Sequence, residues 1–228
     1  LPPPDSQEPA TMSYVSADPV RAVLDDPRSA AVLVTTVATR GPDHTRRTAE
    51  QAVAAARRAP WPRGLLSLTV YTSGDDDSVL TYAQWDAEDR IPATGPSDGA
   101  GAVSRVFRHY RTVRGTAVEE PAPVPESFPA AFFPAEDERA ARAWLDGLLA
   151  GEERTEGDDR AYPGALAAHL HIAADGGQVL SFSEWVAEEP AVAHIEAVWA
   201  PVLKDFGGTG TLYRHHRTFL PPDATAPR

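Results

Sequence analysis

Cysteine is absent from this chain of 228 residues. Disulfide bonds, thiolate metal sites and cysteine nucleophiles are therefore excluded. The chain also lacks an apolar run long enough to cross a bilayer, and its N-terminus lacks the basic and then apolar stretch of a signal peptide. We therefore expect a soluble cytoplasmic protein without a membrane partner.

Positive charge is scarce as well. Lysine and arginine together number 21 against 33 acidic residues, which gives a formal net charge of −12, and Lys204 is the only lysine. A negative field of this size repels phosphate backbones, so nucleic acid is not expected as a partner. Two catalytic motifs are also missing. The Gly-rich turn at residues 207–210 is not followed by the helix that a dinucleotide fingerprint requires, and no serine-hydrolase elbow occurs.

What the sequence does contain is an internal repeat. Residues 64–88 align with residues 164–188 without a gap. Residues of the first copy that are identical in the second are Gly64, Leu66, Val79, Leu80, Trp85, Ala87 and Glu88. A second block, residues 107–113, matches residues 213–219 after a small insertion. Two matching blocks in the same order favour the duplication of one unit.

Both copies show the same order of elements. Segments that are β-branched or alternating predict strands, and segments rich in Ala, Arg and Glu predict helices. Turns rich in Asp and Gly, at residues 74–77 and 175–177, each close a hairpin. We expect strands at residues 30–39, 65–72, 79–85, 105–113, 128–133, 166–172, 179–185 and 211–219, and helices at residues 42–59, 136–150 and 190–203.

This order is β-α-β-β-α-β, the ferredoxin-like unit. It predicts an α+β fold in which two tandem ferredoxin-like units bury the bare faces of their sheets against each other, as an intramolecular dimeric α+β barrel. The chain would then be a pseudo-dimer, and further dimerisation stays open. The expected parts are a tail or arm at residues 1–27, a first unit at 28–115, a linker at 116–127, a second unit at 128–220 and a tail at 221–228.

The two copies are not equivalent. In the first copy, the second helix is replaced by residues 90–101, which proline and glycine should keep irregular. The second copy keeps a full helix at this place. We therefore expect a working site in the second copy and treat one in the first copy as doubtful.

The second copy also carries a family resemblance. A Pro-Gly pair opens a strand, a hairpin follows, the next strand ends in Trp185, and His194 stands nine residues later on a helix. This pattern resembles the antibiotic biosynthesis monooxygenase family, whose members have the dimeric α+β barrel fold. The resemblance covers about residues 30–114 and 127–220. The first copy departs from it, because Thr94 stands where the pattern has histidine.

The resemblance implies an oxygenase that oxidises a polycyclic phenolic, polyketide-derived substrate with O2, by quinone formation or oxidative ring opening in antibiotic biosynthesis. Members of the family work without a metal, whereas the fused two-copy relatives include enzymes that use reduced flavin. The expected cofactor is therefore none, or reduced FMN or FAD as a cosubstrate with a flavin reductase as partner. Two alternatives stay open: a non-catalytic ligand-binding or stress-response barrel, and a haem-binding or haem-degrading relative.

Four residues are candidates for catalysis. Trp185 offers a flat apolar wall and an indole N–H, although a tryptophan at a strand end also commonly packs in a core. His194 could act as a general base or as an orienting donor toward a phenol. It lies at the edge of an apolar helical face formed by Ile195, Val198, Trp199 and Val202. Arg214 and His216 could stabilise a phenolate, although most arginines on the last strands should pair with acidic residues.

Five residues are candidates for contact with the aromatic substrate: Trp85, Phe182, Ser183, His169 and His171. The two histidines alternate on one strand and share a face with Phe182 and Glu184, opposite the face of Trp185. We therefore expect them between the two sheets, hydrogen-bonded across the interface. Together with Glu184 they resemble a ligand set, but a His-x-His pair alone is weak support, and no metal is expected.

Overall fold

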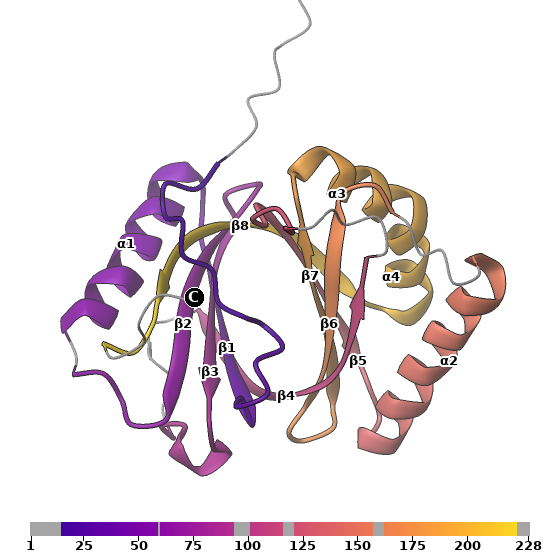
Figure 1. The fold of residues 1–228 in the computed structure, drawn as a ribbon, viewed down its shortest axis with the longest axis horizontal. Helices are drawn as coiled ribbons and strands as arrows, with labels where there is room; N and C mark the ends of the chain where they lie inside the picture. The colour runs from indigo at the N-terminus through magenta and orange to yellow at the C-terminus, as the bar shows by residue number, and fades with distance from the viewer. Residues whose placement is uncertain (1–14, 59, 94–100, 116–120, 157–161, 223–228) are drawn as a thin grey trace, which may run out of the picture.

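The computed structural model describes residues 15–58, 60–93, 101–115, 121–156 and 162–222 (Figure 1). Its strands and helices confirm those expected from the sequence, with shifts of a few residues at their ends. The strands are β1 (Ala31–Ala38), β2 (Leu65–Ser73), β3 (Ser78–Trp85), β4 (Ala102–Arg114), β5 (Ser127–Pro134), β6 (Ala165–Ala173), β7 (Gln178–Trp185) and β8 (Thr209–Phe219). The helices are α1 (Pro42–Arg58), α2 (Glu138–Glu156), α3 (Glu188–His194) and α4 (Ala200–Phe206), with a π-helical turn at Ile195–Trp199 and a 3-10 turn at Glu88–Arg90.

The strands close into one antiparallel barrel in the order β1-β3-β2-β8-β5-β7-β6-β4. Each half of the chain contributes its last, first, third and second strand in that order, namely β4-β1-β3-β2 and β8-β5-β7-β6. The halves are joined where β2 pairs with β8 and where β4 pairs with β6. The α+β class expected from the sequence is confirmed, and closure leaves the barrel without a free edge.

Large aromatic side chains fill the barrel interior. Alternation along each strand points every second residue inward, and the inward positions carry rings from both halves of the chain. Tyr82 of the first half stacks on Phe182 of the second, with ring centroids 5.3 Å apart and planes 13° apart. Tyr71, Phe128 and Tyr213 are buried in the same cluster. The interior is therefore a packed core.

The helices lie outside the barrel, on opposite sides (Figure 1). Helix α1 covers β2, β3 and β8, while α2 covers β6 and the α3–α4 helix covers β5 and β7. In α2, one face is buried through Ala141, Leu145 and Leu149, which repeat every four residues. None of the helices in the described ranges is long and apolar enough to span a bilayer.

Residues 15–27 dock against the barrel. Ala22 and Leu24 are buried in the interior cluster. The Asp18 carboxylate accepts the backbone N–H of Thr218 at 3.0 Å. The remaining parts of the expected tails, of the irregular loop and of the linker, at residues 1–14, 94–100, 116–120 and 223–228, lie outside the described residues.

Candidate functional site

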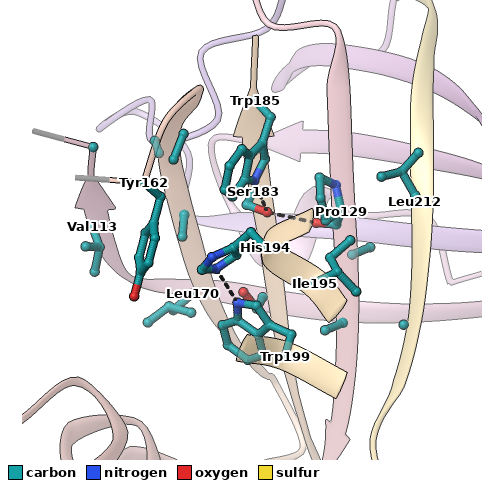
Figure 2. A pocket seen from close by; sticks show the side chains of 18 of the residues that line it. Val113, Pro129, Tyr162, Leu170, Ser183, Trp185, His194, Ile195, Trp199 and Leu212 are labelled. Atoms are coloured by element: carbon teal, nitrogen blue, oxygen red, sulfur yellow. Dashed lines mark hydrogen bonds between the residues drawn. The ribbon is translucent and has the colours of Figure 1, made fainter. Parts of the chain in front are cut away.

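A cavity of about 330 Å³ lies between the outer face of the second half's strands and the helices that cover them (Figure 2). Residues of β5, β6, β7 and β8 form its floor, and residues of α2 and of the α3–α4 helix with its π turn form the opposite wall. Most of the lining residues are apolar. The volume is near the lower end of the range for ligand pockets, about 300–1,000 Å³, and suits a compact small molecule.

Small side chains on the strands leave this space open. Ala131 on β5 and Ala165 and Ala168 on β6 line the floor. The pairing of β5 with β7 is interrupted between Ser127 and Ala130, where Pro129 has no N–H to donate. The backbone carbonyl of Pro129 accepts a hydrogen bond from the Ser183 hydroxyl at 3.3 Å.

Trp185 forms one side of the cavity, at the end of β7. Its side chain is buried, and its indole N–H donates to the Ser183 hydroxyl at 3.3 Å. Because Ser183 donates onward to Pro129, a short chain of hydrogen bonds holds the indole plane. Trp185, a candidate for catalysis, and Ser183, a candidate for substrate contact, both line the cavity.

His194 lies at the centre of a group of three aromatic side chains (Figure 2). Its ring centroid is 4.2 Å from that of Tyr162 and 5.0 Å from that of Trp185. The indole N–H of Trp199 donates to Nε2 of His194 at 3.1 Å. An indole nitrogen can only donate, so Nε2 is the acceptor and the neutral imidazole carries its proton on Nδ1.

The charged residues at the cavity are few. Glu152 of α2, Glu196 of the π turn and Arg114 at the end of β4 belong to its lining. Arg114 forms an ion pair with Asp25 of the docked arm. Apart from His194, which is neutral in the tautomer described above, Arg114 is the one basic side chain among the described lining residues. The two glutamates therefore make the electrostatic potential at the cavity mainly negative.

Two candidates for catalysis, Arg214 and His216, and one candidate for substrate contact, Trp85, lie outside this cavity. Arg214 points to Glu188 at the start of α3 and forms two hydrogen bonds with its carboxylate, at 2.8 and 2.9 Å. His216 is half-buried on the side of α1, where burial and then Arg217 lower its pKa. Trp85 is buried beside Leu33 and Leu65 in the first half. The sequence could show that these side chains were polar or aromatic, but not which face of the barrel would carry a cavity.

Phe182, His169 and His171 lie in the barrel interior, behind the sheet that forms the cavity floor. All three are fully buried. Nε2 of His169 pairs with the Glu184 carboxylate at 3.0 Å, and Nε2 of His171 pairs with the Tyr82 hydroxyl at 2.8 Å. The bond from His171 to Tyr82 crosses between the two halves of the barrel, whereas the bond from His169 to Glu184 joins neighbouring strands of the second half. Burial, and then the neighbouring His169, lower the pKa of His171 to about 3.

Within the ranges that the structure describes, no three His, Asp or Glu side chains are grouped so that they could hold a metal ion. His109 lies near both histidines, with its ring centroid 5.6 Å from that of His171 and 6.4 Å from that of His169. The nitrogens of these three rings form hydrogen bonds with Thr112, Glu184 and Tyr82.

Two residues of the site were not singled out by the sequence analysis. Trp199 counted there only as part of the apolar helical face, and Tyr162 precedes the Pro-Gly pair that opens β6. The available signal was Pro201, because a proline inside a helix disturbs the turn before it. This proline indicates that a spacing of 3.6 residues per turn does not give the direction of the Trp199 side chain.

Comparison with known proteins identifies relatives of the fold. Neither a protein-family model nor a curated protein matches the sequence. An anthrone oxidase-like protein of known structure superimposes with a TM-score of 0.66 at 18% identity, over 89% of this chain and 97% of that one. A protein from Fusobacterium nucleatum, provisionally named a monooxygenase, has a TM-score of 0.52 at 9% identity, over 84% and 95% of the chains. One from Lactobacillus acidophilus with the same provisional name has a TM-score of 0.50 at 7% identity, over 84% and 97%. These likenesses establish the fold that the chain shares with such proteins.

Proposed function

We propose that the protein is an oxygenase that oxidises a compact polycyclic phenol or anthrone with O2 to a quinone. The observation that carries this proposal is the apolar cavity in which His194 lies between the rings of Tyr162 and Trp185. Flat aromatic walls suit a fused-ring substrate, and an apolar lining excludes water from a reactive intermediate. The similarity to an anthrone oxidase-like protein and to proteins named as monooxygenases supports the same class of reaction. A polyketide origin of the substrate, and a role in making an antibiotic, are part of the proposal.

We further propose that the barrel arose by duplication and is a pseudo-dimer of two ferredoxin-like units. The matching strand order of the two halves and the repeated sequence blocks support this origin. In this arrangement the second unit holds the site, and the first completes the barrel.

The proposed reaction balances without an external reductant. An anthrone and one O2 yield an anthraquinone and one water. Before it enters the cavity, the substrate loses a proton to bulk water and becomes an electron-rich anion, whose charge is shared between a ring carbon and the ring oxygen. This anion passes one electron to O2, and the two radicals combine at the carbon to give a hydroperoxide after protonation. Loss of water from the hydroperoxide then forms the second carbonyl of the quinone.

In this scheme the protein positions the substrate and stabilises the anion. The hydrogen bond from Trp199 occupies the Nε2 lone pair of His194. We therefore assign to His194 the role of an Nδ1–H donor to the anionic oxygen, not that of the base. Trp185 serves as a wall that is held in place by Ser183. A positioned donor of this kind commonly contributes about a hundredfold to the rate.

The residues present do not fit a tightly bound flavin or an axially ligated haem. The flavin phosphate would face Glu152 and Glu196, while Arg114 is already paired with Asp25. Haem iron would need Nε2 of His194, which Trp199 occupies. We therefore propose O2 as the only co-substrate and keep reduced flavin, delivered by a reductase, as an outcome that the experiment below distinguishes.

Oxygen uptake with 1,8-dihydroxyanthrone tests the proposal after the enzyme-free rate is subtracted. We expect uptake without flavin, quinone formation equal to uptake, and a loss of about a hundredfold in His194→Ala. The matched control is His44→Ala, which changes an exposed histidine of α1 and should leave the rate unchanged.

Other outcomes have definite meanings. Uptake that needs added reduced flavin would replace the direct reaction of the anion by a flavin-dependent one. Binding of the anthrone without uptake would contradict the oxygenase and leave a ligand-binding barrel. A saturable shift of the haem absorbance band on titration would favour a haem-binding relative.

A further inference from the structure

The helix that carries His194 changes its winding immediately after that residue. Helix α3 ends at His194, a π-helical turn spans Ile195–Trp199, and α4 continues from Ala200. In the π turn the backbone N–H of Ala200 donates to the carbonyl of Ile195, five residues back. Single π turns inside α-helices are rare and occur frequently at functional sites.

Pro201 gives a physical reason for this turn. In a regular α-helix its ring would clash with the carbonyl of the residue four positions earlier, and it has no N–H to donate to that carbonyl. A wider turn before the proline relieves this conflict. The π turn stands directly before Pro201, so the local sequence accounts for its position.

The π turn brings two side chains together that an α-helix would separate. At 3.6 residues per turn, residues five apart point in directions about 140° apart around the helix axis. His194 and Trp199 are five apart, yet the Trp199 indole N–H reaches Nε2 of His194 at 3.1 Å. Figure 2 shows the two side chains on the same side of the helix, facing the cavity.

We propose that Trp199 is a positioning residue that, through this π turn, holds His194 as the Nδ1–H tautomer in the active cavity. Neutral imidazole in water prefers the proton on Nε2, so the protein must impose the other form. With Nε2 accepting from Trp199, Nδ1 is the ring nitrogen of His194 that carries the proton. The consequence of this tautomer for catalysis rests on the proposed function, whereas the tautomer itself does not.

The same bond disfavours the charged imidazole. Protonation of Nε2 would place two N–H groups against each other, because the indole nitrogen cannot accept. Among the described residues, the other titratable or charged groups that line the cavity are Glu152 from α2, Tyr162 from the segment before β6, Arg114 from β4 and Glu196 from the π turn itself. Of these groups, Arg114 is paired with Asp25, and the hydrogen bond recorded at Nε2 comes from Trp199.

The direct test is nitrogen NMR of the histidine rings in the wild-type protein and in Trp199→Phe. In the wild type, we expect His194 to show a protonated Nδ1 and an unprotonated Nε2. In Trp199→Phe, which keeps a ring but removes the N–H, we expect the Nε2–H form to become the major one and the midpoint of His194 titration to rise. Trp144→Phe is the matched control, because Trp144 packs on Phe133 outside the cavity lining.

Kinetics with 1,8-dihydroxyanthrone then separate positioning from packing. Loss of positioning should lower kcat about tenfold and leave KM nearly unchanged, since the aromatic surface is kept. A wild-type spectrum with the proton on Nε2, or a tautomer that does not change in Trp199→Phe, would overturn the proposal. The expected tautomer shift in a protein that does not oxidise the anthrone would uphold the positioning role and reject the oxygenase.

Discussion

The two halves of the barrel have the same strand order but differ in what lies outside their sheets. In the second half, Pro129, Ala165 and Ala168 line an open cavity. The strand register places Leu33, Leu65 and Leu68 at the corresponding positions of the first half, where they pack against Trp85. Larger side chains thus fill this face of the first half. In addition, the 3-10 turn Glu88–Arg90 stands where the second half has the helix from α3 to α4 that forms a wall of the cavity.

The two equivalent tryptophans show the same contrast in their hydrogen bonds. Trp185 donates to Ser183, whereas the residue two before Trp85 is Ala83. The indole N–H of Trp85 is buried and, within the described part of the chain, has no hydrogen-bond partner. In the second half the indole N–H of Trp185 has a hydrogen-bond acceptor and its ring lines the cavity. In the first half the Trp85 ring packs against apolar side chains. We therefore infer that the site was lost, or never developed, in the first half.

The largest expected effect comes from giving the second half the side chain of the first. In Ala168→Leu, the added three carbons should occupy the floor of the cavity, as Leu68 does beside Trp85. We expect kcat/KM for the anthrone to fall at least a hundredfold, about 2.7 kcal/mol of transition-state stabilisation, while the thermal midpoint stays the same or rises. Steady-state oxygen uptake and thermal unfolding measure the two effects.

The converse substitution is the control for this prediction. Leu68→Ala should create space in the first half and destabilise the fold by about 2 kcal/mol without changing the activity. An Ala168→Leu variant with full activity would place the substrate somewhere other than this cavity. Equal losses of activity in both variants would mean that stability, rather than the cavity, controls the rate.

The barrel interior differs between the halves in its titratable groups. At the position of Tyr71 in the first half, the second half has His171, and both side chains are fully buried. Burial raises the pKa of Tyr71, and the nearby Glu184 raises it further, so this phenol stays neutral. Burial lowers the pKa of His171 to about 3, and burial lowers that of His215 to a similar value. The histidines alone should make the fold sensitive to acid.

The second prediction follows from the sign of that shift. The unfolded chain binds a proton at His171 near pH 6.5, whereas the folded chain resists it down to about pH 3. Stability is therefore complete above pH 6.5 and falls as the pH is lowered toward 3, by about 1.4 kcal/mol per pH unit for one such group. His171→Gln should reduce the loss between pH 7.5 and pH 5 by about 2 kcal/mol, as measured by urea unfolding.

Exposed His44 provides the matched control, because His44→Gln should leave the pH dependence of stability unchanged. His215 should maintain part of the acid sensitivity in the His171 variant. The free energy of unfolding of His171→Gln could instead show the same slope against pH as that of the wild type. In that case unfolding does not expose this histidine, and the packed interior would survive at low pH.

The elements and the fold class could be predicted because they depend on local patterns. Alternation, helix formers and Asp- or Gly-rich turns lie in adjacent residues, and duplication repeats each signal twice. The cluster of His169 and His171 with Phe182 was also predictable, since strand alternation fixes the face that each residue occupies. Trp185 and His194 were placed at the site by family resemblance, not by a rule of packing.

The rest of the site depends on distances that the sequence does not contain. Arg214 and His216 are on the outer face of β8, but only the tertiary fold brings Glu188 to Arg214 and aims His216 toward α1. Trp199 was assigned to an apolar face by a spacing of 3.6 residues, and the π turn before Pro201 breaks that spacing. The cavity depends on small side chains of β5 and β6 and on the helices that stand over them, and the sequence does not contain the distance between these elements.

The smallest expected effect concerns the unpaired indole of Trp85. Ala83→Ser should give its N–H the partner that Ser183 gives Trp185, and should stabilise the fold by about 0.5–1 kcal/mol in urea unfolding. The gain is limited because Leu33 pairs with Ala83 in the strand ladder, so the new hydroxyl lacks the free carbonyl that Pro129 offers to Ser183. The matched variant Ser183→Ala should lose about 1–2 kcal/mol by leaving the second indole unpaired. If Ala83→Ser and Ser183→Ala both destabilise the fold, then a serine at this position needs an acceptor for its own hydroxyl. The indole N–H of the following tryptophan would then not decide the effect.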